Sequence, residues 1–187
     1  VFAVSAFYKQ FENPIEVFYR LTDANEVFYD NAPEADLFGI ELEGRKNVTE
    51  RLQVVANFSY ILSESRMNPG ASNRVPNLER PMVGQSPYVV NASAFYSLPA
   101  LNMDLSLSYN TFGERIVTVG KREQQYDEYE QPFHSLGAKM NYKLGRVGLS
   151  LEASNLLGDD TVYRQGPATT FRYSPGRTFK MGFRLSL

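Results

Sequence analysis

The sequence predicts an all-β fold of antiparallel, up-and-down strands, and three observations lead to this prediction. Apolar and polar residues alternate through most of the chain, which is the period of a strand with two unlike faces. No segment of comparable length has the period of an amphipathic helix. Short turns and long polar connections follow one another along the chain, as they do in a meander of hairpins.

About eight alternating segments account for the expected strands. The clearest is LNMDLSLSYN, in which Leu101, Leu105 and Tyr109 share one face and Asp104 and Ser108 share the other. Each segment is about as long as a tilted strand that crosses a bilayer. In chain order the segments are residues 1–9, 37–45, 51–63, 88–97, 101–110, 135–144, 147–154 and 177–187.

The connections between these segments are of two sizes. KNVTE, LPALN and LGRV are short hairpin turns. The links at residues 65–81, 120–132 and 158–176 are long, polar and rich in Pro and Gly. Short turns at one end and long loops at the other are typical of an outer-membrane barrel, whereas a soluble sandwich usually mixes loop lengths.

Composition excludes several classes of protein. The 187 residues carry a net charge of -2, so there is no basic surplus for binding nucleic acid. The absence of Cys excludes disulfides and thiolate zinc sites. No apolar run reaches the ~18 residues of a transmembrane helix. A mean hydropathy of -0.34 is compatible with a membrane barrel, whose apolar residues alternate with polar lumen residues.

The apolar faces have two possible surroundings, a protein core or a lipid bilayer. A soluble all-β sandwich or barrel would turn them inward. Lipid is favoured because the alternation is sustained over nearly every segment and because aromatic residues gather near the segment ends, as in the girdles of membrane barrels. These aromatic residues are Phe18, Tyr19, Phe28, Tyr29, Tyr88, Tyr96, Tyr109, Phe112, Phe133, Tyr142, Tyr163 and Tyr173.

Four blocks of sequence carry a resemblance to a known family. They are NAPEADLFGIELEG (31–44), RPMVGQSPYVVNASAFY (80–96), LSLEASNLLGDDTVYRQG (149–166) and YSPGRTFKMGFRLSL (173–187). In this order and spacing they resemble the C-terminal barrel portion of TonB-dependent outer-membrane receptors. The resemblance covers essentially the whole chain and implies a transmembrane β-barrel. Residues 1–187 would supply about the last eight strands of a larger, 22-stranded barrel.

The resemblance also implies a function and partners. The plug domain and its energy-coupling box would be absent from these residues. The whole receptor would take up a scarce nutrient such as an iron chelate, cobalamin or a glycan through the Gram-negative outer membrane. An inner-membrane energy-coupling protein would act through the plug, and outer-membrane lipid would surround the barrel. No enzymatic activity and no cofactor are expected.

Two other functions stay open at this point. One is a stand-alone eight-stranded outer-membrane barrel with adhesin-like loops. The other is a soluble all-β enzyme or binding domain, for example one that binds carbohydrate. The first would have no plug upstream of Val1, and the second would bury Leu101, Leu105 and Leu107 in protein.

Candidate ligand-binding residues lie in the long loops or at their roots. Arg suits anionic groups, and Tyr suits rings or sugars. The alternative is that each is a girdle or surface residue. The candidates are Tyr126, Tyr129, Tyr163, Arg164, Arg172 and Tyr173.

Other polar residues are weaker candidates for catalysis or metal binding. Glu41 and Glu43 share a strand face and could act as an acid–base pair. The favoured interpretation is that they line a hydrated lumen and pair with cations on neighbouring strands. His134 is the only His, which gives no support for a triad or a His-rich metal site. The acidic residues of the outer loops lack the spacing of a calcium loop, so solvated loops are favoured; they are Asp127, Glu128, Glu130, Asp159 and Asp160.

Overall fold

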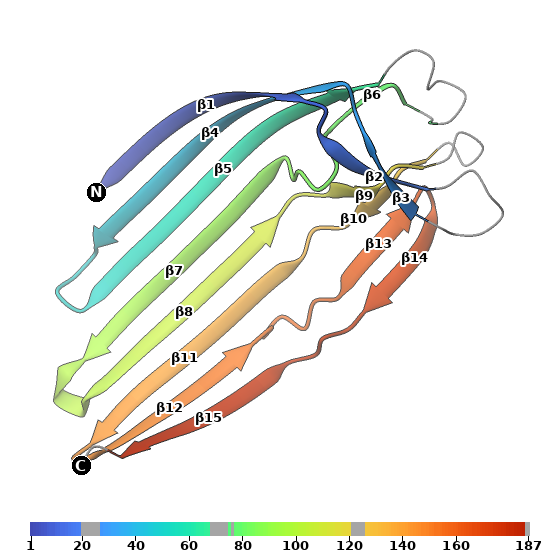
Figure 1. The fold of residues 1–187 in the computed structure, drawn as a ribbon. Coiled ribbons are helices and arrows are strands. Elements are labelled where there is room, and N and C mark those ends of the chain that lie inside the picture. The colour runs from blue at the N-terminus through green and yellow to red at the C-terminus, as the bar shows by residue number, and fades with distance from the viewer. Residues whose placement is uncertain (20–26, 68–74, 76, 121–125, 186–187) are drawn as a thin grey trace.

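The architecture is one large antiparallel sheet with two small sheets at one end (Figure 1). The computed structural model describes residues 1–19, 27–67, 75, 77–120 and 126–185. Eight long strands of the large sheet pair in chain order, each antiparallel to the next. They are β1 (Phe2–Glu12), β4 (Glu34–Asn47), β5 (Leu52–Arg66), β7 (Tyr88–Leu98), β8 (Met103–Phe112), β11 (His134–Leu144), β12 (Val147–Ser154) and β15 (Thr178–Leu185).

The eight expected segments are therefore confirmed as eight strands in an up-and-down order. A ninth strand, β6 (Glu79–Arg80), pairs with the end of β5. Within the described residues, the only helical segment is a 3-10 turn at Pro99–Leu101. No helix of the described chain is long and apolar enough to cross a membrane.

The long connections contain short strands that the alternation pattern did not predict. One set forms a four-stranded sheet, and the other is a two-stranded hairpin. These strands are short and lie among Pro, Gly and polar residues, so their alternation gives only a weak signal. The four-stranded sheet comprises β9 (Arg115–Thr118), β10 (Glu128–Glu130), β13 (Thr161–Gln165) and β14 (Ala168–Tyr173), and the hairpin comprises β2 (Ile15–Tyr19) and β3 (Val27–Asn31).

The two ends of the large sheet differ as expected. The turns at residues 48–51, 99–102 and 145–146 lie together at one end, called here the short-turn end. Asn102 and Gly145 adopt left-handed backbone conformations there, with φ of 49° and 57°, which allow the tight reversals. The long connections and the small sheets lie at the opposite, long-loop end (Figure 1).

The strand register places apolar and polar residues on opposite faces. Directly paired residues of an antiparallel sheet share a face. One row across the sheet reads Tyr96, Leu105, Met140, Leu151 and Met181. The adjacent row, on the other face, reads Phe95, Ser106, Lys139, Glu152 and Lys180.

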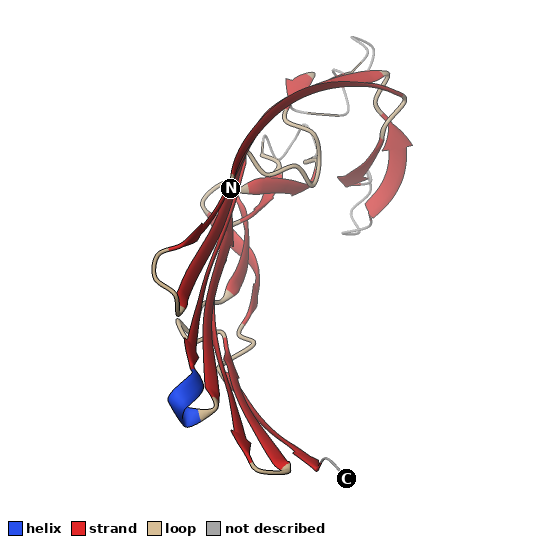
Figure 2. Cartoon of the chain, turned by 90° about the vertical axis from the view of Figure 1, so that its left-hand side faces the viewer, coloured by secondary structure: helices blue, strands red, loops and turns tan. Residues whose placement is uncertain are grey.

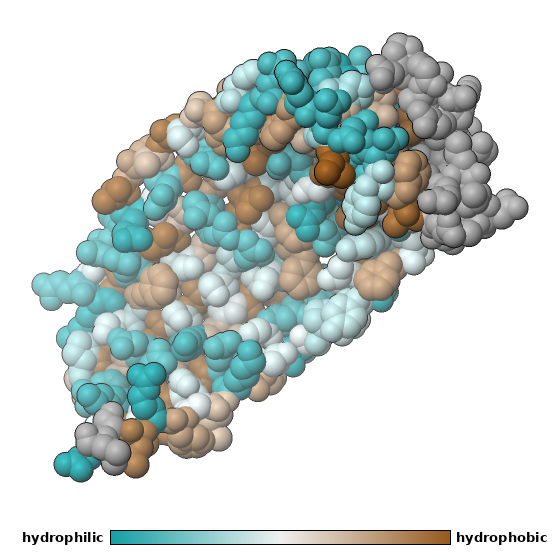
Figure 3. Space-filling view, in the orientation of Figure 1, coloured by the Kyte–Doolittle hydropathy of each residue, from teal (hydrophilic) through white to brown (hydrophobic). Residues whose placement is uncertain are grey.

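The polar face is the concave one. Figure 2 shows the sheet as an arc, with the small elements of the long-loop end on its concave side. Figure 3 looks onto the concave face, where hydrophilic and weakly polar residues predominate over the strands. The apolar rows therefore point outward from the convex face.

No second layer of the described chain covers the convex face. Phe179 and Met181 are 71% and 65% exposed. The buried apolar residues all lie toward the long-loop end, and they are Phe18, Ala32, Ala35, Leu37, Val75, Ile116 and Val119. A soluble sandwich would have its core between two layers, so the exposed rows agree with lipid contact.

The sheet is open in this structure. Among the described strands, β1 and β15 each pair on one side only, and they lie at opposite edges. A closed, stand-alone eight-stranded barrel would pair these two strands with each other. Because unpaired backbone groups are costly in lipid, the open sheet is the geometry of a segment of a larger barrel wall.

A neighbouring side chain closely approaches Gly39 on the concave face. The ring of Phe7, on the neighbouring strand, occupies the place where a Cβ of residue 39 would lie. Lys9 lies 5.2 Å from the centre of the same ring. Any larger residue at position 39 would have to displace Phe7.

Replacing Leu107 with Arg should destabilise the sheet in a bilayer. Leu107 lies in the convex apolar rows, opposite Ala94 and Ala138. A charge near the bilayer midplane is expected to lower the free energy of unfolding by about 2–4 kcal/mol, measured by urea unfolding of the full-length protein in lipid vesicles. Ser106→Arg places the same charge on the concave face and should cost less than about 1 kcal/mol. Equal losses in the two variants would contradict the assignment of faces.

Candidate functional site

The elements of the long-loop end pack around a small apolar cluster of their own. Phe18 of β2, Val75 and Val119 are buried together. The rings of Phe18 and Phe28 lie 5.7 Å apart. Partly buried residues complete the cluster, namely Phe28, Met67, Leu78 and Val83. The assignment of Phe18 to a girdle at the lipid boundary is therefore wrong, because the ring is only 4% exposed and packs among loop residues.

A buried ion pair joins the hairpin to the large sheet. Arg80 of β6 donates from Nη2 to Oε2 of Glu16 on β2, and both side chains are 2% exposed. Nη1 of Arg80 also donates to the carbonyl oxygen of Asn77 at 3.1 Å, and the guanidinium lies 5.4 Å from the centre of the Phe18 ring. A buried pair of this kind fixes geometry, because losing one partner leaves a charge without compensation.

The acidic residues of β10 hold the four-stranded sheet together. Arg115 of β9 donates to Oε2 of Glu130 from Nε at 2.7 Å and lies 2.6 Å from it through Nη2. The hydroxyl of Thr170 on β14 donates to Glu128 at 2.5 Å. Asp127 accepts from the backbone N–H of Gly120 at 2.9 Å. Internal bonds thus occupy these carboxylates, whereas solvated side chains were expected.

The acidic residues after β12 also take part in internal bonds. Asp159 accepts from the backbone N–H of His134 at 2.7 Å and of Asp160 at 3.0 Å. Asp160 lies 3.7 Å from Arg172. In the described residues, no group of three or more His or acidic side chains is arranged to hold a metal ion.

The six candidate residues fall on or beside the same small sheet, but on two different faces. Tyr129 is directly opposite Arg164, and Arg172 is opposite Val162, two residues before Arg164 on the same strand. Tyr129, Arg164 and Arg172 therefore share one face, called here the Tyr129 face. Tyr163 and Tyr173 lie on the reverse face.

The other three aromatic candidates, Tyr163, Tyr173 and Tyr126, lie on the reverse face of this sheet or beside it. The Tyr163 ring packs against Phe171 with 5.2 Å between the centroids. Tyr173 is 58% exposed on the same face. Tyr126 lies outside the strands, where its ring covers Gly166 and its carbonyl accepts from Gln165 at 3.1 Å. A side chain at residue 166 would collide with this ring.

The Tyr129 face continues into the interior of the long-loop end. Ile116, the partner of Tyr129 on β9, is fully buried. A cavity of about 140 Å³ lies beside them, and its lining includes Ile61, Ser63, Pro81, Gln85, Ile116 and Tyr129. Burial raises the pKa of the Tyr129 hydroxyl, and Asp127 and Glu114 raise it further, while Arg80 opposes them. At neutral pH the hydroxyl is therefore a hydrogen-bond donor at the inner end of a face that carries two arginines.

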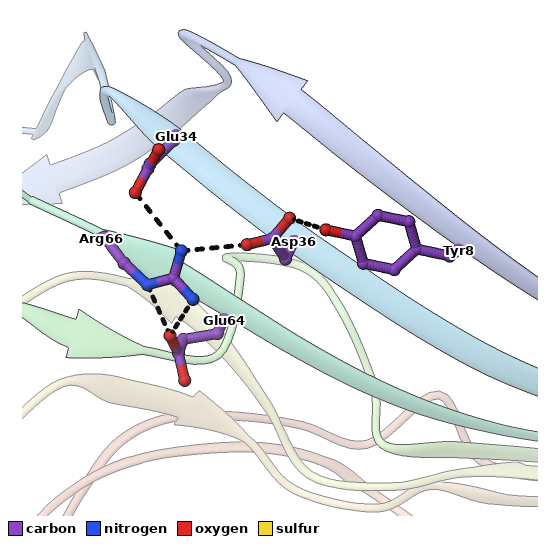
Figure 4. A network of polar contacts seen from close by, with 5 residues as sticks. All are labelled: Tyr8, Glu34, Asp36, Glu64 and Arg66. Carbon is purple, nitrogen blue, oxygen red and sulfur yellow. Dashed lines mark hydrogen bonds and ion pairs between the residues drawn. The ribbon is translucent and has the colours of Figure 1, made fainter.

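A second polar cluster lies away from this site. Figure 4 shows Arg66 between three carboxylates: Glu34 at 3.3 Å, Asp36 at 2.9 Å and Glu64 at 2.6 Å. The hydroxyl of Tyr8 donates to Asp36. By register these side chains share the convex face with the apolar rows, at the long-loop end. The cluster therefore lies at the expected boundary of the lipid near the long-loop end, on the opposite face of the sheet from the concave side.

The remaining polar residues considered above, Glu41 and His134, make hydrogen bonds to neighbouring strands. Glu41 on the concave face accepts from the Ser5 hydroxyl at 3.3 Å, and no ion pair of Glu41 or Glu43 is found among the described residues. The expected cation partners on neighbouring strands are thus not present in that part of the chain. His134, the first residue of β11, shares a 2.7 Å hydrogen bond between its Nδ1 and the Tyr109 hydroxyl.

The family of the chain follows from a comparison with known families. Residues 1–156 match the family described as TonB dependent receptor-like, beta-barrel. The chain belongs to this family. The resemblance seen in four sequence blocks is confirmed, and the antiparallel all-β fold is that of a receptor barrel.

Three solved structures share the fold of this receptor barrel. The copper transporter OprC matches with a TM-score of 0.69 and 15% identity over 100% of this chain and 28% of its own. The ferric-catecholate import receptor Fiu from E. coli K12 gives a TM-score of 0.67 and 14% identity over 98% and 25%. A mutant ferric enterobactin receptor, PfeA from Pseudomonas aeruginosa, gives 0.62 and 17% over 100% and 29%.

The extent of these matches limits what they show. The chain spans about a quarter of the length of each of these structures. At such identities the likeness shows the fold alone. No curated protein sequence matches the chain.

Replacing Arg80 with Met should loosen the hairpin of β2 and β3. Glu16 would stay buried without its partner, which typically costs about 3–5 kcal/mol. Hydrogen exchange of residues 15–19 and 27–31 in the full-length receptor should rise accordingly. The double variant Arg80→Met/Glu16→Met should recover most of the protection, and Arg66→Met in the exposed cluster should change it little. Unchanged exchange in Arg80→Met would contradict the role of the pair.

The hydroxyl of Tyr129 should ionise above its ordinary pKa of 10.0. A raised pKa in the folded state means that the stability Tyr129 contributes is present below pH 10 and is lost as the pH rises through the raised value. The difference in ultraviolet absorbance between the wild-type receptor and Tyr129→Phe should show this tyrosinate only above pH 10. Ionisation at or below pH 10 would contradict the buried position.

Proposed function

We propose that this chain is the final part of the barrel wall of an outer-membrane receptor that imports a scarce nutrient by energy-coupled transport. Two features support the proposal. The sheet has an apolar convex face for lipid and a polar concave face for a wet lumen, and the chain belongs to the receptor barrel family. In such barrels the short turns face the periplasm and the long loops face the outside.

The ligand would enter from the long-loop end, where the Tyr129 face begins beside the cavity of about 140 Å³. Tyr129 would donate a hydrogen bond and Arg164 would attract negative charge, with a further contribution from Arg172, which also lies 3.7 Å from Asp160. The buried pair of Arg80 and Glu16 would keep the hairpin in place around the ligand. No bond is made or broken in this mechanism, so we propose no enzymatic role for the chain.

The chemistry of the Tyr129 face favours an anionic iron chelate over cobalamin or a neutral glycan. Two guanidinium groups and a tyrosine hydroxyl on one face suit a ligand with negative charge and aromatic rings. Two of the structural neighbours are receptors for ferric catecholates, including ferric enterobactin, and the third transports copper. The pairing of Tyr129 with Arg164 beside the cavity is the observation that carries this choice.

The proposal also includes partners and location. The receptor would lie in the outer membrane of a Gram-negative bacterium, with lipid on the convex face and no nucleic acid partner. An inner-membrane energy-coupling protein would act through a plug domain outside residues 1–187. The plug would occupy the lumen and move when the ligand has been captured.

Uptake by cells that carry variants of the full-length receptor tests this function. Arg164→Ala should lower uptake of a ferric catecholate chelate about tenfold or more, because a hydrogen bond to a charged group contributes about 1.5–3 kcal/mol. Tyr173→Ala, on the reverse face of the same sheet, is the matched control and should change uptake little. Dissipating the proton-motive force should abolish uptake. Uptake of cobalamin or a maltodextrin without uptake of the chelate would refute the ligand class, and uptake of none would refute the transport function.

A further inference from the structure

The two small sheets of the long-loop end are joined to each other. Val119, directly after β9, forms a parallel bridge with Phe18 of β2, and its backbone N–H donates to the carbonyl oxygen of Val17 at 2.9 Å. The side chains of Phe18 and Val119 are buried together on this seam. In Figure 1, β2 and β9 accordingly lie side by side. The described strands therefore follow one another in the order β3, β2, β9, β10, β13 and β14, and this arrangement is called here the loop sheet.

The described strands of the loop sheet come from three separate connections of the large sheet, those between β1 and β4, between β8 and β11, and between β12 and β15. Backbone hydrogen bonds cross each neighbouring pair of these strands. Side chains add to them, since Arg115 of β9 binds Glu130 of β10 and Thr170 of β14 binds Glu128 of β10. Moving one of the three connections by itself would leave backbone groups of its neighbour unpaired, which is costly.

Every link between the described strands of the loop sheet and those of the large sheet contains Pro or Gly. Pro lacks a backbone N–H and Gly weakens a strand, so regular pleated structure stops at these links. Two of them also hold left-handed residues, Asn13 with φ of 52° and Gly176 with φ of 70°. The loop sheet is thus set off from the strands that lead into it, as a hinged element is. The links are residues 13–14, 32–33, 113–114, 131–133, 155–160 and 174–177.

A different connection, the one between β5 and β7, fastens the loop sheet to the large sheet. Arg80 of this connection holds the buried carboxylate of Glu16 on β2. The backbone N–H of Gly84 donates to the carbonyl oxygen of Ile116 on β9 at 2.7 Å. Both halves of the loop sheet are therefore held from the same connection. Its apolar residues also pack on the buried seam, and they are Met67, Val75, Leu78 and Val83.

We propose that the loop sheet moves as one body and that Arg80, acting through Glu16, positions the ligand residues that this body carries. Tyr129 lies on β10 and Arg164 on β13, two and three strands away from the point on β2 where Arg80 acts. Displacing the hairpin of β2 and β3 would therefore displace the Tyr129 face with it. The meaning of this coupling for ligand capture rests on the proposed function, but the coupling itself needs no ligand.

Distances between spin labels, measured by double electron–electron resonance on the full-length receptor in lipid vesicles, test the proposal. Residues 1–187 contain no Cys, so labels in this part attach only to Cys introduced there. Suitable exposed positions are Tyr29→Cys on β3, Thr169→Cys on β14 and Leu107→Cys in the large sheet. Thr169 is opposite Arg164 and so reports the position of the ligand face. The pair 29–169 measures the loop sheet itself, and the pairs 29–107 and 169–107 measure each half against the large sheet.

Removing the ion pair should move both halves of the loop sheet together. In Arg80→Met the two distances to residue 107 should shift or broaden together by several ångströms, whereas the 29–169 distance should stay as narrow as in the wild type. Glu16→Gln keeps the shape of its partner and removes the charge, so it is a milder second variant with the same expected pattern. Arg66→Met, in the exposed cluster, is the matched control and should change none of the three distances.

Three results would overturn the proposal. They are a 29–169 distance that broadens along with the others, a shift of the hairpin without a shift at residue 169, and unchanged distances in both variants. Uptake of the ferric catecholate chelate is measured separately in cells that carry the wild-type receptor. A receptor that imports the chelate while its hairpin moves independently refutes only this inference. A receptor whose loop sheet moves as one body but imports nothing refutes only the proposed function.

Discussion

The structure depends on one constraint, that every strand of the large sheet has to satisfy its backbone through its neighbours while its two faces meet different surroundings. The register of the paired strands keeps apolar residues in rows on the convex face and polar residues on the concave face, most regularly across β8, β11, β12 and β15. On the concave side, Asn91 donates to Asn57 at 2.7 Å and accepts from Asn110, so that amides of three strands are linked. A shift of one residue in the pairing of β5 with β7 or of β7 with β8 would break this link and turn an amide toward the lipid.

The long-loop end is stabilised in a different way, because its elements lie beyond the expected lipid boundary and need an apolar core of their own. Phe18, Val75 and Val119 supply that core, and the buried Arg80–Glu16 pair fixes the hairpin against the wall. A ligand face of this kind is held by packing and by paired charges, so it can be rigid although it is built from loop segments. The short-turn end has no comparable core among the described residues, and its concave side is instead rich in cations.

The eight strands and their faces were predictable because alternation over about ten residues is a strong local signal. The strands of the long-loop end were not, because β9 and β10 are short and lie in polar surroundings. The pair of Arg80 and Glu16 joins residues 64 positions apart, and nothing local in either segment marks the other. The six loop candidates do meet on and beside one sheet, but only the register, with a bulge beside Tyr163, shows that Tyr129 and Arg164 share a face while Tyr163 lies on the reverse.

The central claim, that the convex rows contact lipid and the concave rows contact water, is tested most directly by a nitroxide scan of β15 in the full-length receptor in vesicles. Spin labels at successive positions from 178 to 185 report collisions with oxygen, which is enriched in lipid, and with a water-soluble nickel complex. The account predicts strong oxygen collisions at Phe179, Met181, Phe183 and Leu185 and weak ones at the positions between them. The opposite phase, or a strand on which no position meets oxygen, would contradict it.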